Sequence, residues 1–447
     1  YNDRYFKYKV NQFKDLKKTS MNLFRYKNID RKIGPNFAEA NVSNIDLNKL
    51  KPRLHEEKID FDRMRKFRLQ RMRGQMENNK VGATILFDPI NIRYATDARN
   101  MSLFTMHTLA RFVFIPQSGP VILFDYSKSK HLSQDLCTID EVREVVSWDF
   151  FSSGDKVEKN AKTWSQQVDD LMQSYSKDNK HLAIDICDPV GIQALQNNYS
   201  YILCNAQNLT ERARSIKSLD ELVCMRASIE VAEKGINLIH EKLEAGQTEE
   251  ELWSYFHKVN IENGGEWFET RLFTSGPRTN PWLQECSNRV IEKGDLVAFD
   301  TDMVGPYGYC ADISRTFVEG GKLNVEQKKL HDLAVENIKY NEKLIKAGTM
   351  FREFAEKAWK LPDNCYDNHY PCQVHGIGMC DEWPFIVYPN QDYSNGDFNS
   401  VFEENMTITI ESYIGEVGGR EGVKLEDQYL VTKEGLKLLT NHPLNQV

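Results

Sequence analysis

The order of apolar and polar positions divides the sequence into two parts with different patterns. In the first part, short apolar runs alternate with stretches whose apolar positions recur every three to four residues. The runs are rich in β-branched and aromatic residues and are bounded by Gly, Pro or Asp, which predicts strands at residues 82–88, 110–116, 119–125 and 181–186. The helical periodicity predicts helices at residues 61–78, 155–175 and 189–197. Strands that alternate with helices in this way indicate an α/β domain.

The second part opens with a helix-start signal. Ser218 and Glu221 form a capping box, and apolar residues then recur at helical spacing as far as Leu243. Residues 240–258 resemble residues 341–360, since each stretch holds the end of a long helix, an Ala-Gly stop, a Thr and a shorter helix. This repeat predicts an internally duplicated α+β domain. The predicted divisions are an N-terminal arm at residues 1–57, an α/β domain at residues 58–212 and a catalytic domain at residues 213–447.

Charge is distributed unevenly along a chain of otherwise ordinary composition. The 447 residues are 40% apolar and 27% charged, which suits folded globular domains and not a disordered chain. Of 57 Lys+Arg and 65 Asp+Glu, residues 1–80 hold 21 and 10. A basic segment can bind nucleic acid, but Arg alternates with apolar residues at helical spacing in residues 61–76, which favours a solvated helix with one buried stripe. An arm that packs on an acidic neighbour or a second subunit explains the asymmetry equally well, so no nucleic-acid partner is expected.

Two further features bear on where the protein works. No run of about 18 apolar residues occurs, and the first residues lack the apolar core of a signal peptide, so we expect no membrane partner. The nine cysteines are an odd number and are scattered from Cys137 to Cys380 without a CxxC pair. That usage is typical of reduced thiols and predicts a cytoplasmic location.

Acidic residues inside apolar strands supply the candidate chemistry. Residues 296–318 have the pattern of two strands joined by a Gly-Pro turn. Asp300 and Asp302 are two residues apart, so on a strand they would face the same side, and Asp312 lies on the returning strand. Three carboxylates between apolar strands repel one another unless a cation neutralises them. The alternative is three exposed acids on an open sheet edge, but the apolar flanks argue against it.

Two more acids and a histidine extend this set. Glu411 lies in an alternating strand at residues 406–415, Glu426 lies in another at residues 422–432, and His375 precedes a Gly-rich bend. A single His is more often a core residue than a ligand, but the five carboxylates change the balance. Oxygen ligands with one imidazole suit a two-metal site for hard ions such as Fe, Mn or Zn.

The order of these residues resembles the pita-bread metallopeptidase family, which includes methionine aminopeptidase, aminopeptidase P, prolidase and creatinase. The stretches that carry the resemblance are residues 216–222, 312–317, 374–378, 407–411 and 422–427. It implies an α/β creatinase-like N-terminal domain, a duplicated α+β pita-bread catalytic domain and a homodimer. It also implies two divalent metal ions held by Asp300, Asp302, Asp312, His375, Glu411 and Glu426.

The sequence departs from the peptidases of this family at two places. Asp300 and Asp312 have one more residue between them than in the peptidases, and Asp302 is an additional acid. The peptidases carry a His-Glu pair where this chain has Asp381-Glu382. An ionised Asp cannot donate the hydrogen bond with which that His stabilises a tetrahedral intermediate, so an Xaa-Pro metallopeptidase becomes the alternative function. A non-catalytic pita-bread module is a third possibility, but such relatives lose the metal ligands that are intact here.

On these points the chain resembles the dimethylsulfoniopropionate lyases of the same fold. The resemblance implies a small sulfonium substrate, its cleavage to dimethyl sulfide and acrylate, and iron as the metal, with zinc or manganese as alternatives. It implies that Asp381, whose apolar neighbours would raise its pKa, is the general base; a surface acid is the alternative. The expected substrate-binding residues are Tyr370, Trp383 and His375. Tyr370 and Trp383 suit core packing equally well.

Overall fold

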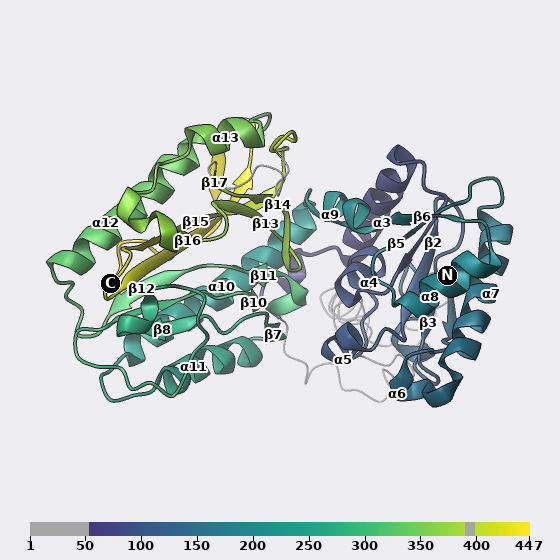
Figure 1. Cartoon of the computed structure of the whole chain (residues 1–447), viewed down its shortest axis with the longest axis horizontal. Coiled ribbons are helices and arrows are strands. Elements are labelled where there is room, and N and C mark those ends of the chain that lie inside the picture. The colour runs from purple at the N-terminus through teal and green to yellow at the C-terminus, as the bar shows by residue number, and fades with distance from the viewer. Residues whose placement is uncertain (1–52, 389–397) are drawn as a thin grey trace, which may run out of the picture. The chain divides into compact units, whose positions relative to one another are not determined.

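The structure, a computed structural model, describes residues 53–388 and 398–447 (Figure 1). These residues form two compact units, with residues 56–214 in the first and residues 53–55 and 215–447 in the second. Most of the predicted arm at residues 1–57 lies outside the described residues. Its last residues include η5 (Glu56–Lys58), a short 3-10 helix.

The first unit is a mixed six-stranded sheet with accompanying helices. The strand order is β4-β3-β2-β1-β5-β6. The strands are β1 (Ala83–Leu86), β2 (Phe112–Pro116), β3 (Ile122–Asp125), β4 (Glu141–Glu144), β5 (His181–Ile184) and β6 (Ile202–Asn205). The helices are α3 (Phe61–Asn78), α4 (Pro89–Thr96), α5 (Ser102–His107), α6 (Phe150–Ser153), α7 (Val157–Tyr175), α8 (Pro189–Asn198) and α9 (Gln207–Arg214). The four predicted strands and three predicted helices are confirmed. The edge strands β4 and β6 are not among the predicted strands. Both are half exposed; β4 is mostly charged, and β6 has an apolar run of only three residues.

The second unit combines two helix pairs with three antiparallel sheets. Its helices are α10 (Leu219–Lys242), α11 (Glu249–Glu262), α12 (Val325–Asn341) and α13 (Phe351–Lys357). Its strands are β7 (Trp267–Phe268), β8 (Phe273–Ser275), β9 (Leu296–Phe299), β10 (Met303–Val304), β11 (Cys310–Ala311), β12 (Arg315–Val318), β13 (Val374–Ile377), β14 (Asp381–Ile386), β15 (Thr407–Gly415), β16 (Gly422–Val431) and β17 (Leu436–Leu438). The sheets have the orders β11-β10-β7, β12-β9-β8 and β14-β13-β15-β16-β17.

The same kind of turn joins the two helices in each pair. Gly246 and Gly348, the glycines of the two Ala-Gly stops, have φ values of 102° and 93°, which favour glycine. Their N–H groups donate to the carbonyls of Ile291 and Phe402, at 2.9 and 2.8 Å. Two residues later each segment forms one isolated antiparallel bridge, to residues 290 and 401 respectively. This repeated geometry confirms the predicted internal duplication.

The five-stranded sheet has one apolar and one polar face. Along β15, Ile408 and Ile410 belong to the apolar core on one side, and α12 packs against β15 and β16. Thr409 and Glu411 alternate with them and therefore point to the other side. The polar face is the one that carries the candidate site.

All nine cysteines are free thiols, as their spacing predicts. The cytoplasmic location stays a prediction. Within the described ranges, no helix has the length and apolarity that crossing a membrane requires.

Candidate metal centre

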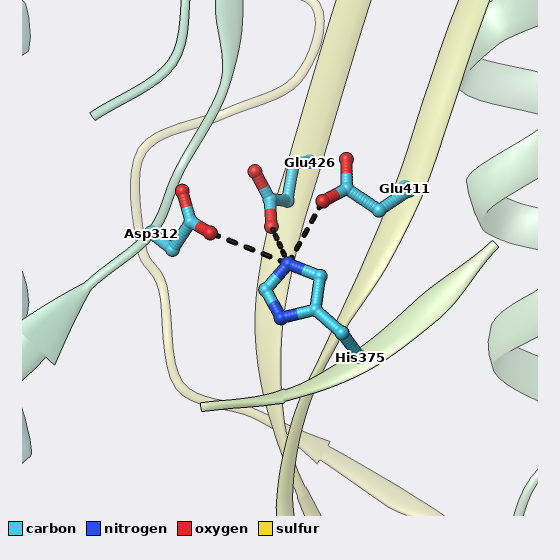
Figure 2. Close-up of side chains that lie close together, drawn as sticks. All are labelled: Asp312, His375, Glu411 and Glu426. Carbon is cyan, nitrogen blue, oxygen red and sulfur yellow. Dashed lines mark hydrogen bonds and ion pairs between the residues drawn. The ribbon is translucent and has the colours of Figure 1, made fainter. Parts of the chain in front are cut away.

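His375 is the centre of a group of four buried side chains (Figure 2). Its Nε2 lies 3.0 Å from Glu411 Oε1, 3.4 Å from Asp312 Oδ2 and 3.6 Å from Glu426 Oε1. Glu411 and Glu426 are directly opposed on β15 and β16, so both side chains stand on the polar face of the sheet. The four residues come from β13, β15, β16 and the loop between β11 and β12, and together they could hold a metal ion.

A second group of carboxylates adjoins the first. It consists of Asp300, Asp302 and Asp312, which are buried and offer ligand oxygens within 4.8 Å of one another. Asp312 belongs to both groups. A shared carboxylate of this kind is how dinuclear sites hold two ions about 3.5–4 Å apart.

The prediction that Asp300 and Asp302 lie on one strand is wrong. Strand β9 ends at Phe299, and Asp302 has a φ of 34°, in the left-handed region. The hydroxyl of Thr301 donates to the carbonyl of Ala311 at 2.7 Å and accepts from the N–H of Ile313 at 2.9 Å. These two residues flank Asp312. This side-chain bridge, and not strand alternation, brings the aspartates together.

Lys424, which sequence reasoning missed, is buried inside the carboxylate cluster. Its Nζ lies 2.9 Å from Asp300 Oδ2, 2.5 Å from Glu411 Oε2 and 3.4 Å from Glu426 Oε2. It also donates to Ser314 Oγ at 2.6 Å. Although burial alone would raise the pKa of Asp300, the ammonium of Lys424 lowers it. The alternation of residues 422–432 already places Lys424 and Glu426 on one face, so this signal was available in the sequence.

Burial and like charges govern protonation in the cluster. Burial, followed by the charge of Asp300, raises the pKa of Asp302 and of Asp312 well above the usual range. Burial and neighbouring Glu411 raise the pKa of Glu426 to about 8. Each of these shifts favours the protonated carboxyl until another positive charge, such as a bound metal ion, takes the place of the proton.

The residues present fit two divalent cations. Five ionised carboxylates and one lysine leave four negative charges, which two divalent ions would balance. Glu426 Oε1 is buried and has no hydrogen-bond partner in the part of the chain that the structure describes. A set of oxygen ligands with a single imidazole suits hard ions. We therefore describe this cluster as a carboxylate–histidine metal site.

Asp381 begins β14 and lies at the edge of the cluster. Its Oδ1 is 3.9 Å from His375 Nδ1, the ring nitrogen that faces away from the candidate ligands. Half of its side-chain surface (50%) is exposed, whereas the candidate ligands are buried. Partial loss of hydration and the charges of Asp300 and Glu411 raise the pKa of its carboxyl, against the opposing charge of His375. A solvent-accessible carboxylate with a raised pKa is suited to accept a proton.

A buried ion pair braces the hairpin that carries Asp381. Lys217 Nζ lies 2.8 Å from Glu382 Oε2, and each side chain is only 1% exposed. The other oxygen of Glu382 accepts a hydrogen bond from the N–H of Met379 at 3.1 Å. A Cβ at Gly378 would lie 2.4 Å from Glu382 Oε1, so a larger residue there would displace the Glu382 carboxylate. Sequence spacing could not reveal the pair, because its members are 165 positions apart.

The two aromatic candidates have different surroundings. The ring centroid of Tyr370 lies 4.6 Å from the ammonium of Lys424, so this ring borders the cluster. The ring of Trp383 lies 5.4 Å from that of Phe351 and packs against the apolar core. For Trp383 this is the core packing that the sequence left open as the alternative to substrate binding.

Known proteins resemble this chain over most of its length. Residues 223–433 match metallopeptidase family M24, and residues 68–216 match the creatinase/prolidase N-terminal domain. The chain is 36% identical over 392 residues to dimethylsulfoniopropionate lyase DddP of Roseovarius nubinhibens, covering 86% of this chain and 87% of that protein. It is 35% identical over 427 residues to the protein of the same name from Roseobacter denitrificans, covering 92% of each. In fold it resembles a prolidase from Thermococcus sibiricus, with a TM-score of 0.69 and 22% identity over 85% of this chain and 97% of that one.

Proposed function

This chain belongs to the family of DddP-type dimethylsulfoniopropionate lyases, and on that premise we propose that it cleaves dimethylsulfoniopropionate by metal-assisted β-elimination. The family assignment confirms the creatinase-like α/β domain and the duplicated pita-bread domain expected from sequence. The observation that carries the mechanism is the position of Asp381, a half-exposed carboxylate 3.9 Å from a ring nitrogen of His375.

The reaction removes a proton and breaks a carbon–sulfur bond. Asp381 takes the proton from the carbon next to the substrate carboxylate, and the C–H electron pair becomes the double bond of acrylate. The bond between the β-carbon and sulfur breaks, and its electron pair leaves with dimethyl sulfide. The raised pKa of Asp381 makes it a stronger base than an ordinary aspartate.

Six residues would hold the metal ions in this proposal. They are Asp300, Asp302, Asp312, His375, Glu411 and Glu426. When bound, two divalent cations supply positive charge that stabilises the negative charge developing on the substrate carboxylate. Iron is the first candidate, on the strength of the resemblance stated above, and zinc and manganese are the alternatives.

The remaining features concern recognition and assembly. Tyr370 borders the cluster at Lys424, so we assign it to the wall of the substrate site. One end of the substrate is a cationic sulfonium group, and aromatic faces attract such cations. The homodimer expected from the resemblance is part of the proposal, with the arm at residues 1–57 reaching the other subunit.

Gas release tests this proposal directly. Purified protein mixed with dimethylsulfoniopropionate should release dimethyl sulfide into the headspace and form acrylate in equal amount. The competing function is hydrolysis of an Xaa-Pro dipeptide, which requires a hydrogen-bond donor where Asp381 stands. Dipeptide hydrolysis without gas release would overturn the proposal in favour of the peptidase.

A further inference from the structure

The edge strand β14 presents an exposed phenylalanine on the polar face of the five-stranded sheet. Phe385 is directly opposed to His375 of β13, and directly opposed residues of an antiparallel pair point to the same face. The next pair, Ile386 and Val374, points to the other face, where both residues belong to the apolar core. Phe385 is 48% exposed, whereas its neighbours Pro384 and Ile386 are buried.

Phe385 therefore stands beside a candidate metal ligand and on the same strand as the proposed base. Typical cross-strand geometry separates the Cβ atoms of directly opposed residues by about 4.5–5.5 Å. Asp381 also lies against His375, at 3.9 Å, and is exposed to a similar extent. The two exposed side chains of β14 thus flank His375 where the buried cluster meets solvent.

The other aromatic candidates already have partners for their rings. Tyr370 faces the ammonium of Lys424, with 4.6 Å between ring centroid and nitrogen. Trp383 packs on Phe351. Phe385 has an exposed ring in the same region.

We propose that Phe385 is a substrate-binding residue whose ring receives the dimethylsulfonio group of the substrate. The inference rests on the proposed function. With the substrate carboxylate directed to the metal site and the α-carbon at Asp381, the sulfonium end extends beyond the buried carboxylates toward the exposed rim. A phenyl ring there attracts the positive charge with its face and covers the methyl groups with apolar surface.

Two substitutions of opposite effect test the role of this ring. Phe385→Leu keeps an apolar side chain and removes the π face, so KM for dimethylsulfoniopropionate should rise about 3- to 30-fold with kcat changed less than about 2-fold. Phe385→Trp supplies a stronger cation-binding face and should leave KM unchanged or lower. The inhibition constant of 4-methylpentanoate, an isostere of the substrate in which an uncharged CH group replaces the sulfonium sulfur, should change less than about 2-fold in Phe385→Leu.

A matched control and two contrary outcomes complete the test. Tyr340→Leu removes an aromatic ring of similar exposure (46%) from α12, the helix that covers the opposite face of the sheet. It should change neither KM for dimethylsulfoniopropionate nor the inhibition constant of 4-methylpentanoate. An unchanged KM in Phe385→Leu would overturn the inference, and so would equal losses of affinity for dimethylsulfoniopropionate and for 4-methylpentanoate. Absence of gas release by the wild type would instead reject the proposed function, so the two failures are distinguishable.

Discussion

The ammonium of Lys424 lies 2.9 Å from Asp300 Oδ2, inside a cluster of five buried carboxylates. The lysine is fully buried, and its pKa is raised well above the usual value because the charges of Asp300 and Glu411 outweigh the effect of burial. Lys424 is therefore a permanent positive charge of the site. It reduces the charge that metal ions must balance from five to four.

Removal of this lysine should destabilise the protein. Lys424→Met leaves buried carboxylates without a partner, a change that costs about 3–5 kcal/mol of unfolding free energy. Urea unfolding measures the loss. Lys328→Met, which breaks an exposed pair with Asp332, is the control and should cost less than about 1 kcal/mol. Equal effects of the two substitutions would show that Lys424 does not neutralise the cluster.

Asp381→Asn should separate catalysis from metal binding. The substitution keeps the size of the side chain and removes the proton acceptor, so turnover should fall about 10²- to 10⁴-fold. Metal content, measured by elemental analysis, should stay at the wild-type value because no candidate ligand changes. Asp332→Asn, at an exposed position on α12, is the control and should retain full activity. Wild-type gas release by Asp381→Asn would remove Asp381 from the mechanism.

Metal should stabilise the protein more at high pH than at low pH. Without metal, the folded-state pKa of Glu426 is about 8 against an ordinary value of 4.5, so the folded chain holds a proton that the unfolded chain has lost. The proton on Glu426 therefore stabilises the metal-free fold at low pH, and this stabilisation is lost as pH rises through about 8. Metal binding becomes stronger over the same interval, because fewer protons must be displaced.

Thermal unfolding with and without a chelator measures this dependence. The difference in Tm between metal-loaded and chelated protein should grow from about pH 5.5 to about pH 8.5. A difference that does not change with pH would contradict the raised pKa of Glu426. Full activity with well under one metal ion per chain would contradict the metal site itself.

The buried pair of Lys217 and Glu382 should control the position of Asp381. Lys217→Met breaks the 2.8 Å contact and leaves Glu382 with an uncompensated buried charge, which costs about 3–5 kcal/mol. Activity should also fall, although no candidate ligand or base changes, because the hairpin before Asp381 loses its brace. Lys357→Met, in an exposed pair on α13, is the control for stability. If Lys217→Met changed stability and left kcat intact, the pair would stabilise the fold without positioning the base.

The protein should be a homodimer in solution. The basic segment at residues 1–80 and the acidic remainder of the chain suggest contact between subunits, and the family resemblance implies a dimer. Light scattering at micromolar concentration should return twice the 51.9 kDa of one chain. A mass of one chain would reject the dimer, and loss of the dimer on raising the salt concentration would identify the contact as electrostatic.

Local patterns in the sequence determined the elements that carry the site. The alternation around Glu411 and Glu426 predicted two strands, and the structure has them as β15 and β16. The capping box of Ser218 and Glu221 likewise predicted the start of α10. These predictions succeed because strand alternation and helix capping depend on residues only a few positions apart.

Tertiary structure alone decided how these elements meet. The register that opposes Glu411 to Glu426, the left-handed turn at Asp302 and the pairing of Phe385 with His375 depend on which hydrogen bonds the folded segments form, and residue spacing does not specify these. The same is true of Lys424, whose strand position was readable but whose contact with Asp300 was not, because 124 positions separate the two residues. Residue spacing sets the side of a strand on which a side chain stands, whereas the packing of the whole domain selects its partners across the sheet.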